Sequence, residues 1–125
     1  MREIKFRGQD ISGVWHFGDL IHYRNCVTIS EYKNGLYGNH EVISDTVGQF
    51  TGFTDVDDNE IFEGDIIQHA KYPAGILIVF FDDNVAAFAV KEPKQPLSEK
   101  IFANYKVIGN FHDNYDLLKE GVNID

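Results

Sequence analysis

Residues 49–69 read Gln49-Phe50-Thr51-Gly52-Phe53-Thr54-Asp55-Val56-Asp57-Asp58-Asn59-Glu60-Ile61-Phe62-Glu63-Gly64-Asp65-Ile66-Ile67-Gln68-His69. The stretch begins with an aromatic strand pattern that a glycine interrupts, and it ends in an apolar strand pattern after Glu63-Gly64-Asp65. The run between the two patterns is rich in Asp, which is typical of a turn. We therefore expect this stretch to enter a small β-core. Its buried residues should be Ile61, Phe62, Ile66 and Ile67.

Two β-hairpins are predicted on either side of this stretch. The strand pattern of Val27–Tyr32 leads into Asn34-Gly35, a dipeptide that tolerates the positive φ angles of a type I′ turn. Farther along, Ile76–Phe81 and Val85–Val90 are β-rich and flank an Asp/Asn turn, which gives the clearest hairpin signal in the chain. Because both of these runs are almost wholly apolar, we expect burial on both faces or closure into a small barrel.

The chain length of 125 residues fits one domain, and the whole pattern predicts a mainly β fold. We expect a small five-stranded β-barrel core over residues 49–112, preceded by additional N-terminal strands in residues 1–48. A short C-terminal helix is predicted over residues 113–120, with Asn114 as its N-cap.

The charge of the chain bears on the partners it can bind. There are 20 Asp and Glu against 11 Lys and Arg, which gives a formal net charge of −9. Such a protein repels phosphate backbones, so its overall charge works against nucleic-acid binding. The charge suits solubility, a basic protein partner, or imitation of nucleic acid, and solubility alone is the favoured interpretation.

Several features of the sequence favour the cytoplasm. The single Cys26 excludes an intramolecular disulfide, which fits a reducing compartment. There is no run of about 18 apolar residues that would span a membrane. The start, Met1–Arg7, alternates charged and apolar residues and lacks the apolar segment of a signal peptide.

Several segments together carry a resemblance to a known family. The central stretch resembles the signature of the YopX family, and further similar segments follow the family's order along most of the chain. The similar segments are Met1–Arg7, Gly13-Val14-Trp15, Gly18-Asp19-Leu20, Thr46–Phe53, Asp55, Asn59, Glu60–Ile67 and Val107–Asn110. One departure is Asn114-Tyr115, where relatives often have Asn-Pro, and it bears only on the start of the last helix.

The resemblance implies a small protein that phages, prophages or other bacterial mobile elements encode, with a core similar to SH3-type barrels and no known enzymatic activity. We therefore expect a non-catalytic accessory protein in the cytoplasm of the bacterial host. Its expected partner is a host or phage protein. A second copy of the chain, bound through an open strand edge, is also an expected partner. The alternative is nucleic-acid binding by the small β-barrel. The basic residues for that alternative are Lys71, Lys91, Lys94, Lys100 and Lys106.

The acidic part of the central stretch has two interpretations beyond a plain turn. Asp55, Asp57 and Asn59 match positions one, three and five of a calcium-binding EF-hand loop. The match fails at Glu60, where Gly is needed, and at Ile66, where Glu is needed, so an acidic turn is favoured over a calcium site. The second interpretation is an interaction patch, weighed against a solvated turn. The patch residues are Asp55, Asp57, Asp58, Glu60, Glu63 and Asp65.

The remaining candidates for chemistry are the histidines. His16 and His22 lie on one face of a strand pattern, but the five histidines show no HxH or HExxH spacing. Ordinary surface or core-edge histidines are therefore favoured over a metal site. The sequence also has no nucleophile elbow, P-loop or dinucleotide-binding glycine pattern. We predict no catalytic residues, no cofactor and no metal.

Overall fold

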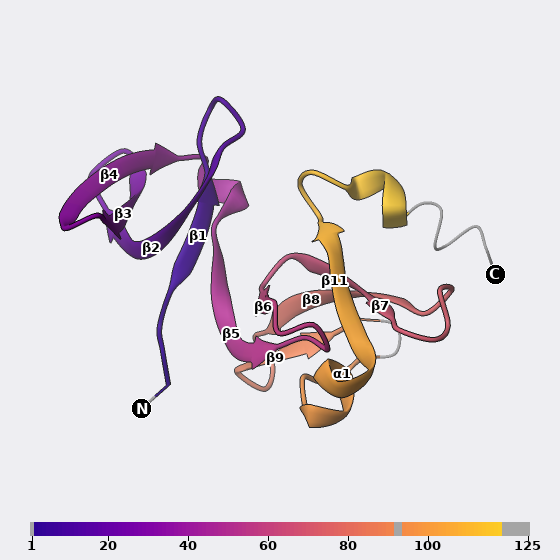
Figure 1. Ribbon diagram of the computed structural model, residues 1–125. Helices are drawn as coiled ribbons and strands as arrows, with labels where there is room; N and C mark the ends of the chain where they lie inside the picture. The colour runs from indigo at the N-terminus through magenta and orange to yellow at the C-terminus, as the bar shows by residue number, and fades with distance from the viewer. Residues whose placement is uncertain (1, 92–93, 119–125) are drawn as a thin grey trace. The chain divides into compact units, whose positions relative to one another are not determined.

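The computed structural model describes residues 2–91 and 94–118, and antiparallel strands dominate it (Figure 1). This confirms the prediction of a mainly β protein. The chain divides into two compact units, Met1–Phe50 and Thr51–Asp125. The boundary predicted between residues 48 and 49 lies two residues before this division. The strand β5, Gly48–Thr54, contributes residues to both units.

The first unit is a sheet with the strand order β4-β3-β2-β1, and β5 begins beside β1. Neighbouring strands pair antiparallel. The elements are β1 (Phe6–Gln9), β2 (Trp15–His22), β3 (Val27–Lys33), β4 (Leu36–Val42) and the 3₁₀ helix η1 (Ser44–Thr46). Asn34 and Gly35 have φ angles of 55° and 82°, so the predicted type I′ hairpin between β3 and β4 is confirmed.

The sheet of the first unit curls, so that the end of β4 returns to the end of β1. The backbone N–H of Ile43 donates to the carbonyl oxygen of Gln9 at 2.8 Å. A Cβ atom at Gly8 would lie 2.7 Å from Cγ2 of Val42, so glycine permits this close approach. Val42 and Ile29 are buried inside the curl. The curl brings a side chain of β2 onto one of β4, the stacked rings of His16 and His40, although β3 separates the two strands in the sheet.

The second unit is a sheet with the strand order β10-β9-β8-β7-β11. Its elements after β5 are β6 (Glu60–Phe62), β7 (Asp65–His69), β8 (Ile76–Asp82), β9 (Ala87–Val90), β10 (Gln95–Pro96), α1 (Glu99–Asn104) and β11 (Tyr105–Asn110). The predicted β8–β9 hairpin is confirmed, with Val79 opposite Val90 and Asp82 opposite Ala87. Val85 belongs to the turn and not to the second strand.

The predicted SH3-like barrel is not confirmed. The last strand, β11, returns to pair with β7, but β10 and β11 form two open edges of the sheet in the described part of the chain. Pro96 lies in the edge strand β10, where the missing N–H costs no ladder hydrogen bond. The predicted C-terminal helix is present at residues 115–118, directly after Asn114, and its predicted residues 119–120 lie outside the described residues.

The core of the second unit gathers apolar side chains from β6 to β9, the segment after β10 and α1. Its buried residues are Ile61, Ile67, Leu77, Val79, Val90, Leu97 and Ile101. The four residues of the central stretch that we expected in the core are all buried, with exposed fractions of 3% or less. The helix α1, which the sequence patterns did not predict, contributes Ile101 to this core.

A matched pair of valines in the β8–β9 hairpin tests this core. Val90 is fully buried, whereas Val85 is 63% exposed in the turn. Val90→Ala removes two buried methyl groups and leaves a cavity, so we expect the free energy of unfolding to fall by about 2 kcal/mol. Val85→Ala should change it by less than about 0.5 kcal/mol. Chemical denaturation followed by circular dichroism measures both, and equal effects would contradict the assigned core.

Candidate functional site

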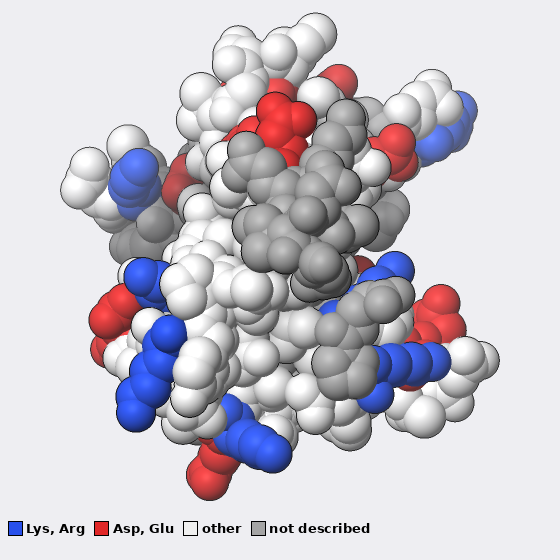
Figure 2. Space-filling model, turned by 90° about the vertical axis from the view of Figure 1, so that its right-hand side faces the viewer, with Lys and Arg blue, Asp and Glu red and all other residues white. Residues whose placement is uncertain are grey.

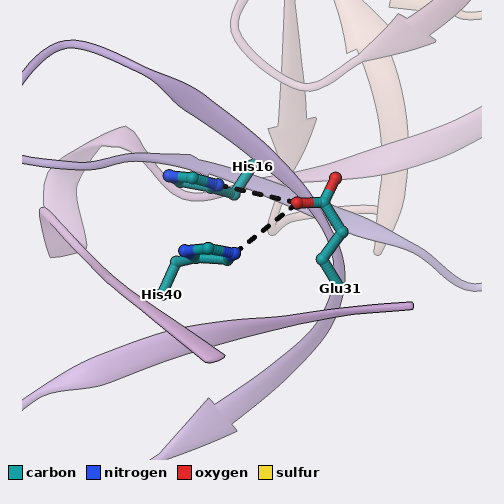
Figure 3. Close-up of side chains that lie close together, drawn as sticks. All are labelled: His16, Glu31 and His40. Carbon is teal, nitrogen blue, oxygen red and sulfur yellow. Dashed lines mark ion pairs between the residues drawn. The ribbon is translucent and has the colours of Figure 1, made fainter. Parts of the chain in front are cut away.

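Two histidines and a glutamate from three strands of the first unit come together, as Figure 3 shows. His16 lies in β2, Glu31 in β3 and His40 in β4. The Nδ1 atom of His16 and the Nε2 atom of His40 each lie 3.7 Å from the same Oε1 atom of Glu31. The two imidazole rings stack with centroids 3.8 Å apart and an angle of 8° between their planes. We call His16, Glu31 and His40 the histidine cluster.

The strand register explains how these residues meet. Opposite residues in the β3–β4 hairpin are Ile29 with His40 and Glu31 with Gly38. Residues two apart on a strand project from the same face, so Glu31 and His40 share the face that carries the buried Ile29. His16 stands two strands away from His40 in the sheet order, and the curl brings its ring onto that of His40. Spacing along the chain therefore gives no motif.

Asp10, in the turn between β1 and β2, holds the far side of the His16 ring. Its Oδ2 atom lies 2.8 Å from Nε2 of His16, and its Oδ1 atom accepts the N–H groups of Ser12 and Val14. The hydrogen bond from His16, followed by the one from Val14, lowers the pKa of the Asp10 carboxyl below its ordinary value of 3.8. An ionised carboxylate only accepts hydrogen bonds, so Nε2 of His16 carries a proton and Nδ1 faces Glu31.

The three side chains of the histidine cluster differ in how far they are buried. The exposed fraction of the side chain is 11% for His16, 21% for Glu31 and 38% for His40. The cluster is thus enclosed at His16 and reached from solvent at His40. Two imidazole nitrogens and one carboxylate oxygen form a ligand set that suits divalent transition metals such as zinc. The sequence patterns missed this cluster because its residues come together only through the hairpin register and the curl.

The other histidines lie apart from the histidine cluster. His22 shares β2 with His16 but is exposed, and so is His112. The Nδ1 atom of His69 accepts the backbone N–H groups of Lys71 and Tyr72, which shapes the loop after β7. His16 and His22 thus belong to one strand, but His22 takes no part in the histidine cluster. The partner of His16, His40, lies on another strand.

Asp55 is the first residue of the predicted interaction patch, and it is only 4% exposed. Its Oδ1 atom accepts the backbone N–H groups of Asp57 at 2.9 Å and Asn59 at 2.8 Å. Its Oδ2 atom accepts the N–H group of Val107 in β11 at 2.8 Å. Both carboxylate oxygens thus bind backbone, and the carboxylate joins the acidic turn to the last strand of the second unit.

The other five residues of the patch differ in burial. Asp65 is 1% exposed, and its Oδ2 atom accepts the N–H group of Phe62 at 2.7 Å across the turn between β6 and β7. Glu60 and Glu63 are half-buried, while Asp57 and Asp58 are exposed. Only these last two of the six are exposed, so a docking patch here would depend on them first.

The five lysines of the nucleic-acid alternative all belong to the second unit. The Nζ atom of Lys94 lies 3.0 Å from Oδ2 of the buried Asp82, and that of Lys91 lies 4.9 Å from the centre of the Phe80 ring. On the face that Figure 2 shows, Lys and Arg are interspersed with Asp and Glu. Residues 51–125 hold six basic and fourteen acidic residues, so the acidic excess lies in this unit. The unit that carries these lysines thus has a net negative charge.

A comparison with protein-family models matches residues 4–119 to the family described as YopX protein. The chain belongs to the YopX family. No curated protein matches the chain significantly. In this YopX member, the signature residues Asp55 and Asp65 are both buried, and the carboxylate of each binds backbone N–H groups. Among the described residues, no helix has the length and apolar character that a membrane crossing requires.

The role of Asp55 gives a stability prediction. Asp55→Ala leaves the N–H groups of Asp57, Asn59 and Val107 without their carboxylate acceptor. We expect the free energy of unfolding to fall by about 3 kcal/mol, because buried groups without partners are costly. Asp57→Ala, at an exposed neighbouring carboxylate, should cost less than about 0.5 kcal/mol. Urea denaturation compares the two variants. A small effect of Asp55→Ala would show that the carboxylate is not a structural link.

The ion pair between Lys94 and Asp82 gives a pH prediction. The hydrogen bond from Lys94, aided by the N–H group of Asn84, lowers the pKa of Asp82 below its ordinary value of 3.8. A lowered pKa in the folded state means that the pair stabilises the fold at neutral pH. This contribution is lost as the pH falls below 3.8 and through the lowered value.

In the Lys94→Ala variant the pKa of Asp82 should rise, which an NMR titration of the side-chain carboxyl carbon detects. Lys100→Ala changes an exposed lysine of the same unit and should leave the titration of Asp82 unchanged. If Asp82 titrates alike in wild type and Lys94→Ala, the ion pair does not form in solution.

Proposed function

We propose that this YopX family protein is a non-catalytic accessory protein of a phage, prophage or related mobile element. It acts in the cytoplasm of the bacterial host by binding another protein. The family membership supports the setting, and the lack of catalytic sequence motifs supports a binding role. The observation that carries the binding role is the exposed aromatic tip and open edge of the β3–β4 hairpin. We call this surface the hairpin edge; its residues are Tyr32, Leu36, Tyr37, Asn39 and Glu41.

The tip of the hairpin exposes large apolar side chains. Leu36 is 74% exposed, Tyr37 71% and Tyr32 63%. Tyr32 and Tyr37 stand opposite each other across the two strands, with ring centroids 4.8 Å apart. Paired tyrosines offer a large contact area at a low cost in side-chain entropy, and tyrosine is enriched among the residues that dominate binding energies. The tip is therefore well suited to anchor a partner.

The outer edge of β4 offers backbone groups to the same partner. β4 ends the strand order of its sheet. In a hairpin with a two-residue loop, the flanking residues Lys33 and Leu36 form a hydrogen-bonded pair, and bonded and non-bonded pairs then alternate. The N–H and C=O groups of Tyr37, Asn39 and Glu41 consequently point away from β3. They are arranged to pair with an added strand.

The occupant we propose is an extended segment of a host or phage protein that adds to β4 as a further strand. In this mode the main-chain hydrogen bonds supply affinity and side-chain pockets supply specificity. β4 has seven residues and contains no Pro or Lys, which are the residues that commonly protect edges against pairing. The edge strand β10 of the other sheet has two residues, one of them Pro96, and suits this role less well.

For the second unit, an SH3-like barrel remains our proposal. Its support is the return of β11 to pair with β7 after the β7–β8–β9 meander. The alternative function for such a barrel is nucleic-acid binding. The ion pair of Lys94 with Asp82 and the acidic excess of residues 51–125 weigh against this alternative. We therefore favour protein binding at the hairpin edge over nucleic-acid binding by the second unit.

A proximity-labelling experiment in the bacterial host tests the proposal with variants of the full chain. Asn39→Pro removes an outward N–H group while leaving the inward hydrogen bonds of the hairpin, and Tyr37→Ala removes an anchor. Tyr23→Ala is the matched control, because Tyr23 is 53% exposed outside the hairpin edge. We expect one protein to be labelled by both the wild type and Tyr23→Ala. Its labelling should fall at least tenfold in each of the two edge variants.

The purified partner must then bind the wild type saturably in calorimetry. Its affinity for Tyr23→Ala should equal that for the wild type, and its affinity for the two edge variants should be lower. Sedimentation of the chain alone shows whether the partner is a second copy, because a dimer would dissociate in Asn39→Pro. The proposal fails if no protein shows this dependence, or if the purified protein binds all variants equally. Salt-dependent DNA binding at low ionic strength that Lys94→Ala weakens would favour the alternative.

A further inference from the structure

We infer that the histidine cluster binds a divalent transition-metal ion, with zinc as the best-suited ion, through Nδ1 of His16, Oε1 of Glu31 and Nε2 of His40. The inference is independent of the proposed function, because none of these three atoms belongs to the hairpin edge. The three ligand atoms lie within 4.8 Å of one another and come from three strands. Two imidazoles and one carboxylate are a ligand set that zinc sites use, with a fourth position left for water.

The distances leave room for an ion between the ligand atoms. At 3.7 Å, neither imidazole nitrogen is within hydrogen-bonding distance of the Glu31 oxygen. Ligand atoms about 2.0–2.2 Å from a tetrahedral zinc ion lie roughly 3.4 Å apart, so each nitrogen-to-oxygen distance must shorten by a few tenths of an ångström. The two nitrogens, which lie within 4.8 Å of each other, must approach to the same separation. The stacked rings must also tilt, because a metal ion prefers the plane of each imidazole. His40 is the more exposed ring and can make this movement.

Asp10 sets the state of His16 that metal binding needs. Its carboxylate accepts the Nε2 proton of His16 at 2.8 Å, which leaves Nδ1 as the nitrogen directed at Glu31. A carboxylate on the far nitrogen of a metal-bound histidine fixes the ring orientation and increases its basicity as a ligand. Asp10 is itself held by the N–H groups of Ser12 and Val14, so its position does not depend on the metal.

Gly38 supplies an independent sign of space beside the ligands. It stands opposite Glu31 in the hairpin register, where any other residue would project a side chain onto the face of the histidine cluster. A Cβ atom at this position would lie 3.3 Å from Nε2 of His40. The φ angle of Gly38 is not positive, so the backbone itself does not require glycine here. The missing side chain keeps the approach to His40 and Glu31 open.

The test measures binding of zinc ions to the full chain after removal of metals, by competition with a chromogenic chelator. We expect one saturable site per chain. Glu31→Gln and His40→Ala should each weaken it about 100-fold, and Asp10→Asn about 10-fold, as ligand and outer-shell changes do. His22→Ala is the matched control, because this histidine is exposed on the same strand as His16. Its affinity for zinc should equal that of the wild type.

Two further measurements keep the inference falsifiable if a ligand variant unfolds. Gly38→Val keeps all three ligands and should weaken zinc binding at least tenfold, while circular dichroism shows an intact β fold. Cobalt bound to the wild type should give the visible absorption of a tetrahedral site. Glu31→Gln should change this spectrum. The inference is overturned if the wild type shows no saturable zinc binding. It is also overturned if His22→Ala weakens binding as much as His40→Ala.

Discussion

The register of the β3–β4 hairpin is the constraint on which both proposed binding features depend. The Asn34-Gly35 turn fixes this register, because two residues with positive φ angles close a two-residue loop. A slip by one residue would exchange the faces of every side chain on β4. Glu31 would then no longer stand opposite Gly38, and Tyr32 would lose its position opposite Tyr37. A local choice of turn residues thus decides which groups point into the curl and which face a partner.

The second unit depends on carboxylates for a different reason. Asp55 and Asp65 are more deeply buried than residues of an acidic surface turn would be, and their oxygens accept backbone N–H groups. Hydrogen bonds to charged groups contribute about 1.5–3 kcal/mol each, whereas an exposed surface charge contributes little. The acidic signature of the central stretch is therefore first a structural device. Its two inward carboxylates shape the turns that lead into β6 and β7, and that of Asp55 also binds β11.

Local patterns in the sequence predicted those parts of the fold that local physics determines. Both hairpins, the mainly β class and the four core residues of the central stretch follow from turn chemistry and apolar runs. The helix α1 was missed because its six residues are too few to show helical periodicity. The curl was missed because it depends on the contact between Gly8 and Val42, which are far apart in the chain. The histidine cluster follows from the curl, so spacing could not reveal it.

The two faces of β4 connect the histidine cluster with the hairpin edge. Because side chains alternate along a strand, His40 projects into the curl, whereas Tyr37 and Asn39 project from the other face. An ion held by β2, β3 and β4 would restrict the movement of β4 without contacting anything on the outer face. An ion in the curl and a partner strand at the edge would therefore not compete for the same groups of β4.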